Sequence, residues 1–497
     1  IIYKDIRVMN LPTNNISYTI SIFNIINNQN NIISNETNDI NGLLSNYGIE
    51  RIFIINNLFM PLSNSAVIDL TYSGNNHSGN KKAKLFNSAL AEGNIVKIDE
   101  VFNGVYKAVF VGYIATVNIS QGTQTGLNLT LNCLSLLGQL SYQLVANYIN
   151  DTLMLGGGEF PITDFVANQV ELGKILLAFQ NESLMSYAIN HQIINSYDSY
   201  NNQQLAFLIR AGEDGLSSKS VVNFFASTND NRFDSLLRTI YAYQRLIYQD
   251  LDGTIKIAIP SVTESGLSDS ISDFYNFDIG KFNDSVAEDS IKYERYSISK
   301  NAGIVCNRAF ASLIPLGFNI IGSNEQNTIN YVSQLSGNIF SRGQQLLKTG
   351  IFTLSRNDIV DLSDNIVRDP TLLRLFDITQ GINNNIVATD VSGVKSNKPI
   401  VGLYANRLLA QDAFLETQLE IDLPRLSCYN KANGTLTDIP LGHTVNVDDN
   451  GNLGLEISKF YCYQMMLNYD INGGTRLSLG LCKPYSFTTL WDDKGAG

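Results

Sequence analysis

Residues 94–139 read NIVKIDEVFNGVYKAVFVGYIATVNISQGTQTGLNLTLNCLSLLGQ, and this stretch decides the fold of the chain. It contains three runs rich in β-branched, aromatic and aliphatic residues, which are Ile95–Val101, Val105–Ile119 and Leu127–Leu137. The pair Asn103-Gly104 and a polar loop separate the runs. In the last run apolar residues alternate with Asn and Thr, which is the period of a strand with one buried face. The stretch therefore predicts three strands.

The same signature occurs on both sides of this stretch. About 145 N-terminal residues read as β structure, with further runs at Tyr18–Phe23, Arg51–Leu58 and Ala66–Tyr72. A second group of runs lies near the C-terminus and comprises Gln418–Leu423, Val445–Val447, Phe460–Tyr469 and Leu477–Leu481, with turns at Pro440-Leu441-Gly442 and Asn472-Gly473-Gly474. Short strands separated by tight turns predict a small antiparallel barrel at this end.

The middle of the chain has a different character. Apolar residues recur at helical spacing in Ile162–Ile194 and Phe233–Tyr248, after the flexible joint Gly156–Gly158, so we expect mainly helices in residues 160–245. Asp252-Gly253 then predicts a hairpin turn within Arg245–Pro260. Residues 290–322 are expected to form strands, and residues 328–349 and 370–415 to be helical or mixed.

The fold class expected from these patterns is mainly β with α insertions (α+β). It consists of two small antiparallel β-barrels joined by a mixed region with a helical insertion. The boundaries we expect are 1–147 for the first barrel, 148–245 for the helical insertion, 246–410 for the mixed β/α connecting domain and 411–497 for the second barrel.

Composition restricts the possible functions. The chain has 497 residues, 44% hydrophobic and 16% charged, with a formal net charge of −12. This acidity argues against a broad surface that grips nucleic acid, because such a surface needs Lys and Arg. No segment approaches the length of a membrane span, since the nearest, 302–322, is interrupted by Asn307, Arg308 and Pro315. The start, Ile1–Asp5, does not read as a signal peptide.

The five cysteines lie at separate positions without a CxxC pair, and Cys133, Cys462 and Cys482 sit in apolar runs. We therefore expect buried free thiols and a reducing assembly compartment.

Motifs for chemistry are weak throughout. The three histidines, His77, His191 and His443, lie outside any HExxH or nucleophile-elbow pattern, and the chain has no P-loop. A Ser–His–Asp triad depends on spatial proximity, so the sequence by itself does not exclude one. The adjacent acid pairs Glu213-Asp214, Asp448-Asp449 and Asp492-Asp493 and the basic stretch His77–Lys84 read as solvated turns or loops. We expect no enzyme, with no catalytic, cofactor-binding or metal-binding residues and no cofactor.

Two stretches together carry a family resemblance. Phe102–Leu140, with a strand ending in Gly-aromatic-Ile, a polar loop, a strand and a Leu-rich segment, resembles the first barrel of tailed-phage baseplate hub proteins. Gln418–Pro484 resembles the second barrel, and the hairpin Tyr248–Ile259 lies where such hubs have one. The family includes the T4-type and Mu-type tail hubs, the tail-associated protein of long-tailed phages and the N-terminal half of type VI secretion spike proteins. These segments cover about a quarter of the chain, and the block at 160–245 is larger than a minimal hub needs.

The resemblance implies a homotrimeric ring that adapts a sixfold tail tube to a threefold spike. The implied partners are the tail tube protein, the central spike protein, baseplate wedge proteins and the tape-measure protein, with DNA or an effector passing only transiently through the lumen. The implied location is the virion, after assembly in the host cytoplasm. No spike repeat, lysozyme or peptidase sequence follows the second predicted barrel, so we expect the spike to be a separate chain.

Two further hypotheses concern the acidic residues and the alternative functions. Acidic residues such as Asp99 and Glu100 are candidates to line the lumen of the ring. The alternative functions are a tail-tip cell-wall hydrolase, either glycosidase or peptidase, and a surface-binding adhesin with β-sandwich domains.

Overall fold

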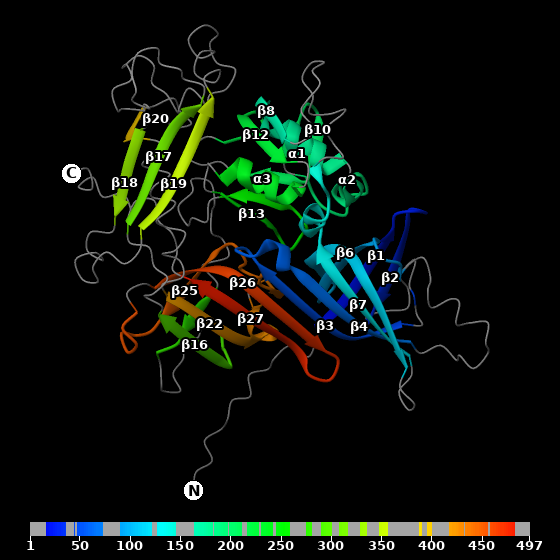
Figure 1. The fold of residues 1–497 in the computed structure, drawn as a ribbon. Helices are drawn as coiled ribbons and strands as arrows, with labels where there is room; N and C mark the ends of the chain where they lie inside the picture. The colour runs from blue at the N-terminus through cyan, green and yellow to red at the C-terminus, as the bar shows by residue number, and fades with distance from the viewer. Residues whose placement is uncertain are drawn as a thin grey trace, which may run out of the picture.

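The computed structural model of the chain is shown in Figure 1. The residues that it describes are 16–35, 44, 47–72, 90–121, 127–145, 164–181, 183–196, 198–210, 216–227, 230–241, 245–258, 275–280, 290–300, 308–316, 329–334, 347–355, 387–389, 395–399, 417–431, 433–455 and 458–482. The chain is mainly β, with three α-helices among these residues.

The largest element is one sheet made from both ends of the chain. Its N-terminal strands are β1 (Ser17–Asn24), β2 (Gln29–Ser34), β3 (Tyr47–Asn57), β4 (Ser65–Tyr72), β5 (Ile95–Phe102), β6 (Val105–Gln121) and β7 (Leu127–Ser135). The middle of the chain adds β15 (Asn276–Asp278) and β16 (Arg295–Lys300), which lie in the predicted connecting domain 246–410. The C-terminal strands are β22 (Thr417–Pro424), β25 (Thr444–Asp448), β26 (Lys459–Asp470) and β27 (Gly474–Cys482). The strand order is β16-β22-β27-β26-β3-β4-β7-β6-β5-β1-β2, and β25 and β15 extend from β26.

The described strands therefore pair as one open sheet, although the sequence predicted two separate barrels. β3 and β26 are the strands through which the two ends of the chain join, and in Figure 1 the blue and red ribbons lie next to each other there. One continuous hydrophobic core lies beneath both halves, and the rings of Tyr18 and Tyr469 meet in it with centroids 4.8 Å apart.

A second core belongs to the middle of the chain. Its elements are β8 (Asp164–Glu171), α1 (Leu172–Asn181), α2 (Leu184–Asn190), β9 (Asp198–Tyr200), β10 (Gln203–Leu205), β11 (Phe207–Ile209), β12 (Val221–Ser227), α3 (Arg232–Tyr241), β13 (Leu246–Gln249) and β14 (Ile255–Ala258). The core also includes Ile95 and Val111 of the large sheet, so this part packs directly on β5 and β6. We refer to it as the middle domain.

The remaining described strands form three small sheets. β17 (Arg308–Leu316), β18 (Ile329–Gln334) and β19 (Leu347–Ser355) form the first, and β20 (Val387–Thr389) pairs with β21 (Lys395–Pro399) in the second. A short hairpin of β23 (Tyr429–Asn430) and β24 (Thr435–Leu436) follows β22.

The structure confirms the three strands predicted around residues 94–139 and the turn at Asn103-Gly104, whereas the predicted polar loop before Leu127 falls mostly outside the described residues. The pair Asn103-Gly104 forms the β5–β6 turn with positive φ angles of 52° and 74°, which favour Asn and Gly. Leu129, Leu131 and Cys133 are buried, and the residues between them are partly exposed. The predicted hairpin at Asp252-Gly253 is also present between β13 and β14.

The predictions of helix are only partly confirmed. Within 160–245, which was expected to be mainly helical, residues 164–171 form β8, which pairs with the apolar strand β12, and the short strands β9, β10 and β11 lie in 198–209. Within 328–349, which was expected to be helical or mixed, described residues form β18 and the start of β19, because β17 lies between these two strands and supplies backbone partners to both. Tertiary pairing overrides the local pattern in both places.

Candidate functional site

The candidate site consists of two strand edges. They are identified by a repeated arrangement of five strands in the large sheet. The N-terminal strands run in the order β5-β6-β7-β4-β3, and the C-terminal strands run in the order β25-β26-β27-β22-β16. Each set is a meander of three strands with two further strands beside the last one. We call the two sets the N unit and the C unit.

Irregularities in the pairing repeat as well. The pairing of β6 with β7 shifts at Ala115, and the pairing of β26 with β27 shifts at Tyr463. A bulge of this kind leaves one extra residue and bends the strand. Counting from the two bulges, Ile119 of β6 corresponds to Leu467 of β26.

The outer strands of the two units correspond in the same way. Ile54 of β3 faces Ala66 of β4, and Ile298 of β16 faces Leu419 of β22. Ala66 faces Cys133 of β7, and Leu419 faces Leu481 of β27. Both Cys133 and Leu481 pair with the residue just before a bulge. Ile298 therefore occupies in the C unit the position of Ile54 in the N unit.

Within the chain, the outer strand of the N unit pairs with the second strand of the C unit. This joint runs antiparallel from Asn57 opposite Gln464 to Arg51 opposite Asp470, and Ile54 faces Leu467. Residues on the inner face of the joint, such as Ile52 and Leu467, are fully buried.

The corresponding edges on the other side are open. Residues 115–121 of β6 pair with β7 on one side. The strand on the other side of β6, β5, pairs only with residues 105–113. Among the described residues, no strand therefore pairs with the second edge of residues 115–121. β16 pairs with β22 and with no second strand among the described ones. Val117, Ile119, Tyr296 and Ile298 at these edges are only partly buried against the core.

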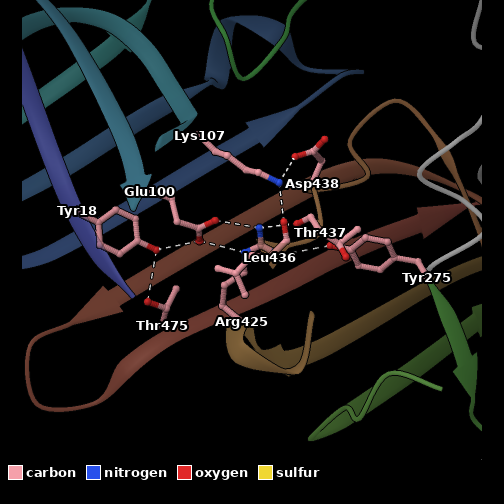
Figure 2. Close-up of polar contacts among 9 residues, drawn as sticks. All are labelled: Tyr18, Glu100, Lys107, Tyr275, Arg425, Leu436, Thr437, Asp438 and Thr475. Carbon is pink, nitrogen blue, oxygen red and sulfur yellow. Dashed lines mark hydrogen bonds and ion pairs between the residues drawn. The ribbon is translucent and has the colours of Figure 1, made fainter. Parts of the chain in front are cut away.

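A buried ion pair fastens the two units together (Figure 2). The Arg425 guanidinium donates to both carboxylate oxygens of Glu100, from Nε at 3.0 Å and from Nη2 at 2.9 Å. Nη2 also donates to the carbonyl oxygen of Thr437 at 2.7 Å. The side chains of Arg425 and Glu100 are 1% and 2% exposed. Burial alone lowers the pKa of Arg425, but the Glu100 carboxylate opposes this and holds the pKa above its ordinary value.

Neighbouring contacts extend this connection. Tyr18 on β1 donates its hydroxyl to Glu100 at 3.4 Å and lies at the same distance from Thr475 on β27. Lys107 on β6 reaches the C unit, where its ammonium lies 2.6 Å from the Asp438 carboxylate (Figure 2). The joint therefore combines backbone pairing with charged contacts.

The hypothesis that Asp99 and Glu100 line a lumen is wrong. Asp99 is buried beside Lys97, and burial raises the pKa of its carboxyl. Glu100 is occupied by Arg425. Both side chains are buried and make contacts within the protein.

The predicted motif residues have structural roles where the structure describes them. His191 follows α2 and stacks on Tyr187 with ring centroids 3.8 Å apart. His443 lies in the predicted turn, where its backbone N–H donates to the carbonyl oxygen of Pro440. The Asp449 carboxylate accepts backbone N–H groups of Gly451 and Leu455, which lower its pKa.

Other residues singled out from the sequence are outside the described part. These are Gly156–Gly158, His77–Lys84, Glu213-Asp214, Asp492-Asp493 and Cys306. Cys133, Cys428, Cys462 and Cys482 are free and buried, which confirms the predicted burial of three of them. Burial raises the pKa of Cys133 to about 12.

The described residues contain neither a metal-binding cluster nor a membrane-spanning helix. No cluster of three or more His, Cys, Asp or Glu side chains suited to a metal ion is present among them. No helix in the described ranges is long and apolar enough to cross a bilayer.

No sequence-family profile matches the chain, and no curated protein matches it. Solved structures do. The 43 kDa tail protein of prophage MuSo2 from Shewanella oneidensis aligns over 94% of this chain and 98% of its own length, with 12% identity and a TM-score of 0.49. The chain is similar in structure to phage tail proteins. The tail protein of Neisseria meningitidis MC58 aligns over 94% of this chain and 96% of its own, with 12% identity and a TM-score of 0.46.

A secretion component is also similar. The E. coli c3393 protein, a component of the type VI secretion system with structural similarity to the T4 bacteriophage tail proteins gp27 and gp5, aligns over 90% of this chain and 77% of its own, with 10% identity and a TM-score of 0.36. These proteins are of the class that the sequence resemblance named.

Proposed function

We propose that the chain is a structural hub of a phage tail baseplate or related injection machine, and that three copies close into a ring. One observation carries the proposal. The sheet contains two units of the same strand order, one joint between units is made within the chain, and the two edges needed for the same joint again have no strand partner among the residues that the structure describes. Open edges of this kind pair readily with another chain.

The repeat specifies how the copies meet. β16 of one copy pairs antiparallel with residues 115–121 of β6 in the next copy. Since Ile54 faces Leu467 within the chain, Ile298 faces Ile119 between copies, and Ser297 faces Ser120. The pairing covers the partly buried apolar side chains at both edges, which supplies a hydrophobic driving force.

A ring of three copies contains six units, which is the number that the resemblance to tail hubs implies. A heterologous contact of this kind closes only if the rotation between units completes a circle. In this proposal the N unit is the counterpart of the predicted barrel 1–147. The C unit combines strands of the predicted barrel 411–497 with β16, which lies in the predicted connecting domain 246–410, and the predicted insertion 148–245 lies between the two units in the chain.

The ring connects the sixfold tail tube to the threefold spike within the virion. Its other partners are the wedge and tape-measure proteins, and DNA or an effector passes through its centre. The protein acts by assembly and has no catalytic step.

Cysteine pairing tests the joint between copies. Ser120 and Ser297 are exposed and lie on the same face of their strands, so the double variant Ser120→Cys, Ser297→Cys should form disulfides between copies upon mild oxidation. The expected product on a non-reducing gel is a covalent trimer of about 165 kDa, three times 55.0 kDa.

The matched control is Asn118→Cys, Ser297→Cys. Asn118 is exposed on the same face but two residues out of the proposed register, so this pair should cross-link far less. A monomeric wild-type protein at micromolar concentration, together with no difference between the two cysteine pairs, would refute the ring.

A further inference from the structure

We propose that a pocket of about 300 Å³, where the two units and the middle domain meet, binds an organic cation. The cation is an alkylguanidinium or alkylammonium group on a short apolar stem. The pocket is lined by Glu100 and residues 107–109 of the N unit, residues 250–252 of the β13–β14 turn, and Arg425 with four residues between 438 and 443 of the C unit. The site is separate from the strand edges of the proposed ring, so it holds or fails independently of the ring.

The charged groups around the pocket pair with one another and leave one carboxylate over. Asp252 forms no ion pair with a described residue, and its carboxylate accepts the backbone N–H of Thr254 at 2.9 Å. The other acidic side chains of the pocket each have a basic partner (two of the pairs are drawn in Figure 2), and these pairs are Glu100–Arg425, Asp438–Lys107 and Asp250–Lys256.

The surroundings of Asp252 disfavour its negative charge. Burial raises the pKa of its carboxyl, and the nearby Asp250 carboxylate raises this pKa further. The Lys256 ammonium acts in the opposite direction but only in part, since it is bound to Asp250. A cation placed beside Asp252 would supply the positive charge that the protein itself does not provide there.

The walls of the pocket suit an organic cation better than a metal ion. Among the residues that the structure describes, no three His, Cys, Asp or Glu side chains lie together as metal ligands would. A volume of about 300 Å³ is at the lower end of the range for small-ligand sites. Such walls pack against the methylene stem of a cation whose head group binds a carboxylate. The apolar side chains that line the pocket between the charged groups are Ala108, Val109, Leu251, Ile439 and Leu441.

The test titrates the full-length chain with n-butylguanidinium and with n-butylurea, a neutral molecule of nearly the same shape. Binding is measured by ligand-observed saturation-transfer NMR. The cation should bind with a Kd of about 1 mM, and the urea should bind about tenfold more weakly or worse, because it lacks the charge that Asp252 attracts. This comparison uses the wild-type chain and so does not depend on the folding of a variant.

Asp252→Asn removes the charge and keeps the size of the side chain. Asn is well accommodated in turns, so the melting temperature should stay close to that of the wild type. The affinity for n-butylguanidinium should fall about tenfold or more, as for loss of a hydrogen bond to a charged group. The matched control is Asp69→Asn on β4, a strand that contributes no residue to the pocket, and it should bind like the wild type.

N-acetyl-arginine amide identifies the source of the cation. Binding as tight as that of n-butylguanidinium supports the site and assigns it to an arginine side chain of a polypeptide. Binding at least about tenfold weaker supports the site and assigns it to a free small cation. The site is overturned if n-butylguanidinium does not bind up to about 10 mM, if n-butylurea binds equally well, or if Asp252→Asn binds like the wild type.

Discussion

Replacing Arg425 with Met should be among the most damaging single changes in the large sheet. The substitution keeps most of the apolar stem of the side chain and removes the guanidinium. It leaves the Glu100 carboxylate buried, with the more distant hydroxyl of Tyr18 at 3.4 Å, and it takes a donor from the Thr437 carbonyl. Removing one partner from a buried ion pair typically costs about 3–5 kcal/mol.

This cost should be visible as a thermal shift. For a unit of some 200 residues, 1 kcal/mol corresponds to roughly 2–4 °C in melting temperature, so Arg425→Met should lower it by about 6–20 °C. The assay is thermal unfolding followed by circular dichroism, with hydrogen exchange of β5 and the segment after β22 as a local readout. Both segments should lose protection, because the pair connects them.

A double-mutant cycle separates the ion pair from general disruption. Arg425→Met combined with Glu100→Gln should be less destabilising than the sum of the two single changes, since the buried charge is gone. The control is Arg51→Met, because the Arg51–Asp69 pair lies on the same sheet at 2.9 Å with side chains 51% and 25% exposed. That change should cost less than about 1 kcal/mol. An Arg425→Met protein as stable as Arg51→Met, or fully additive effects in the cycle, would refute the reasoning.

Three further outcomes are expected. Burial raises the pKa of Asp99 above the unfolded value of about 3.9, so ionisation of Asp99 lowers stability as the pH rises through that interval. Asp99→Asn should therefore raise the free energy of unfolding at pH 7 and change it less at pH 4, measured by urea denaturation. Asp449 should show the opposite dependence on pH, because its pKa is lowered in the folded state. The ionised carboxylate stabilises the fold at pH values above the pKa of the unfolded state, and this stabilisation is lost as the pH falls through the pKa of the folded state. Asp449→Asn should therefore destabilise the protein at pH 7 and do so less in acid. Gly112→Ala should destabilise the protein by about 1–3 kcal/mol or more, because a Cβ at this position would lie 2.2 Å from the carbonyl oxygen of Leu134. The melting temperature of this variant should fall further than that of the control Gly93→Ala, where a Cβ meets nothing within 4 Å although φ is +84°.

Local patterns in the sequence were sufficient for the strands that alternate and for the turns between them. Leu127–Ser135 and Leu477–Leu481 show a period of two because one face of each strand is buried. The turns at Asn103-Gly104 and Asp252-Gly253 were predictable because Asn103, Gly104 and Gly253 have positive φ angles, which Asn and Gly adopt at low cost. The strand β8 was missed because the spacing of its apolar residues also fits a helix, and only its pairing with β12 decides between the two.

Local patterns of apolar and turn residues could not predict the contacts that form the candidate site. β3 and β26 pair although Arg51 and Asp470 are far apart in the chain. The residue pattern of β3 does not indicate which strand it pairs with. The pair of Glu100 with Arg425 spans 325 positions. From the sequence alone, Glu100 looked like an acidic residue at a strand end. Its burial depends on how the β1–β5 segment packs over the C unit, which is a tertiary property.

In the proposed ring, the charges at the strand edges favour pairing of β16 with β6 over pairing with a second β16. β16 begins with Arg295 and ends with Lys300. In an antiparallel pair of two β16 strands, each arginine would face the lysine of the other copy, and like charges directly opposite each other destabilise a sheet. Residues 115–121 of β6 read ATVNISQ and carry no charge. Pairing of β16 with β6 of another copy therefore avoids this repulsion, whereas pairing of two β16 strands does not. That preference favours a head-to-tail contact between copies over a twofold one, and a head-to-tail contact is what a closed ring requires.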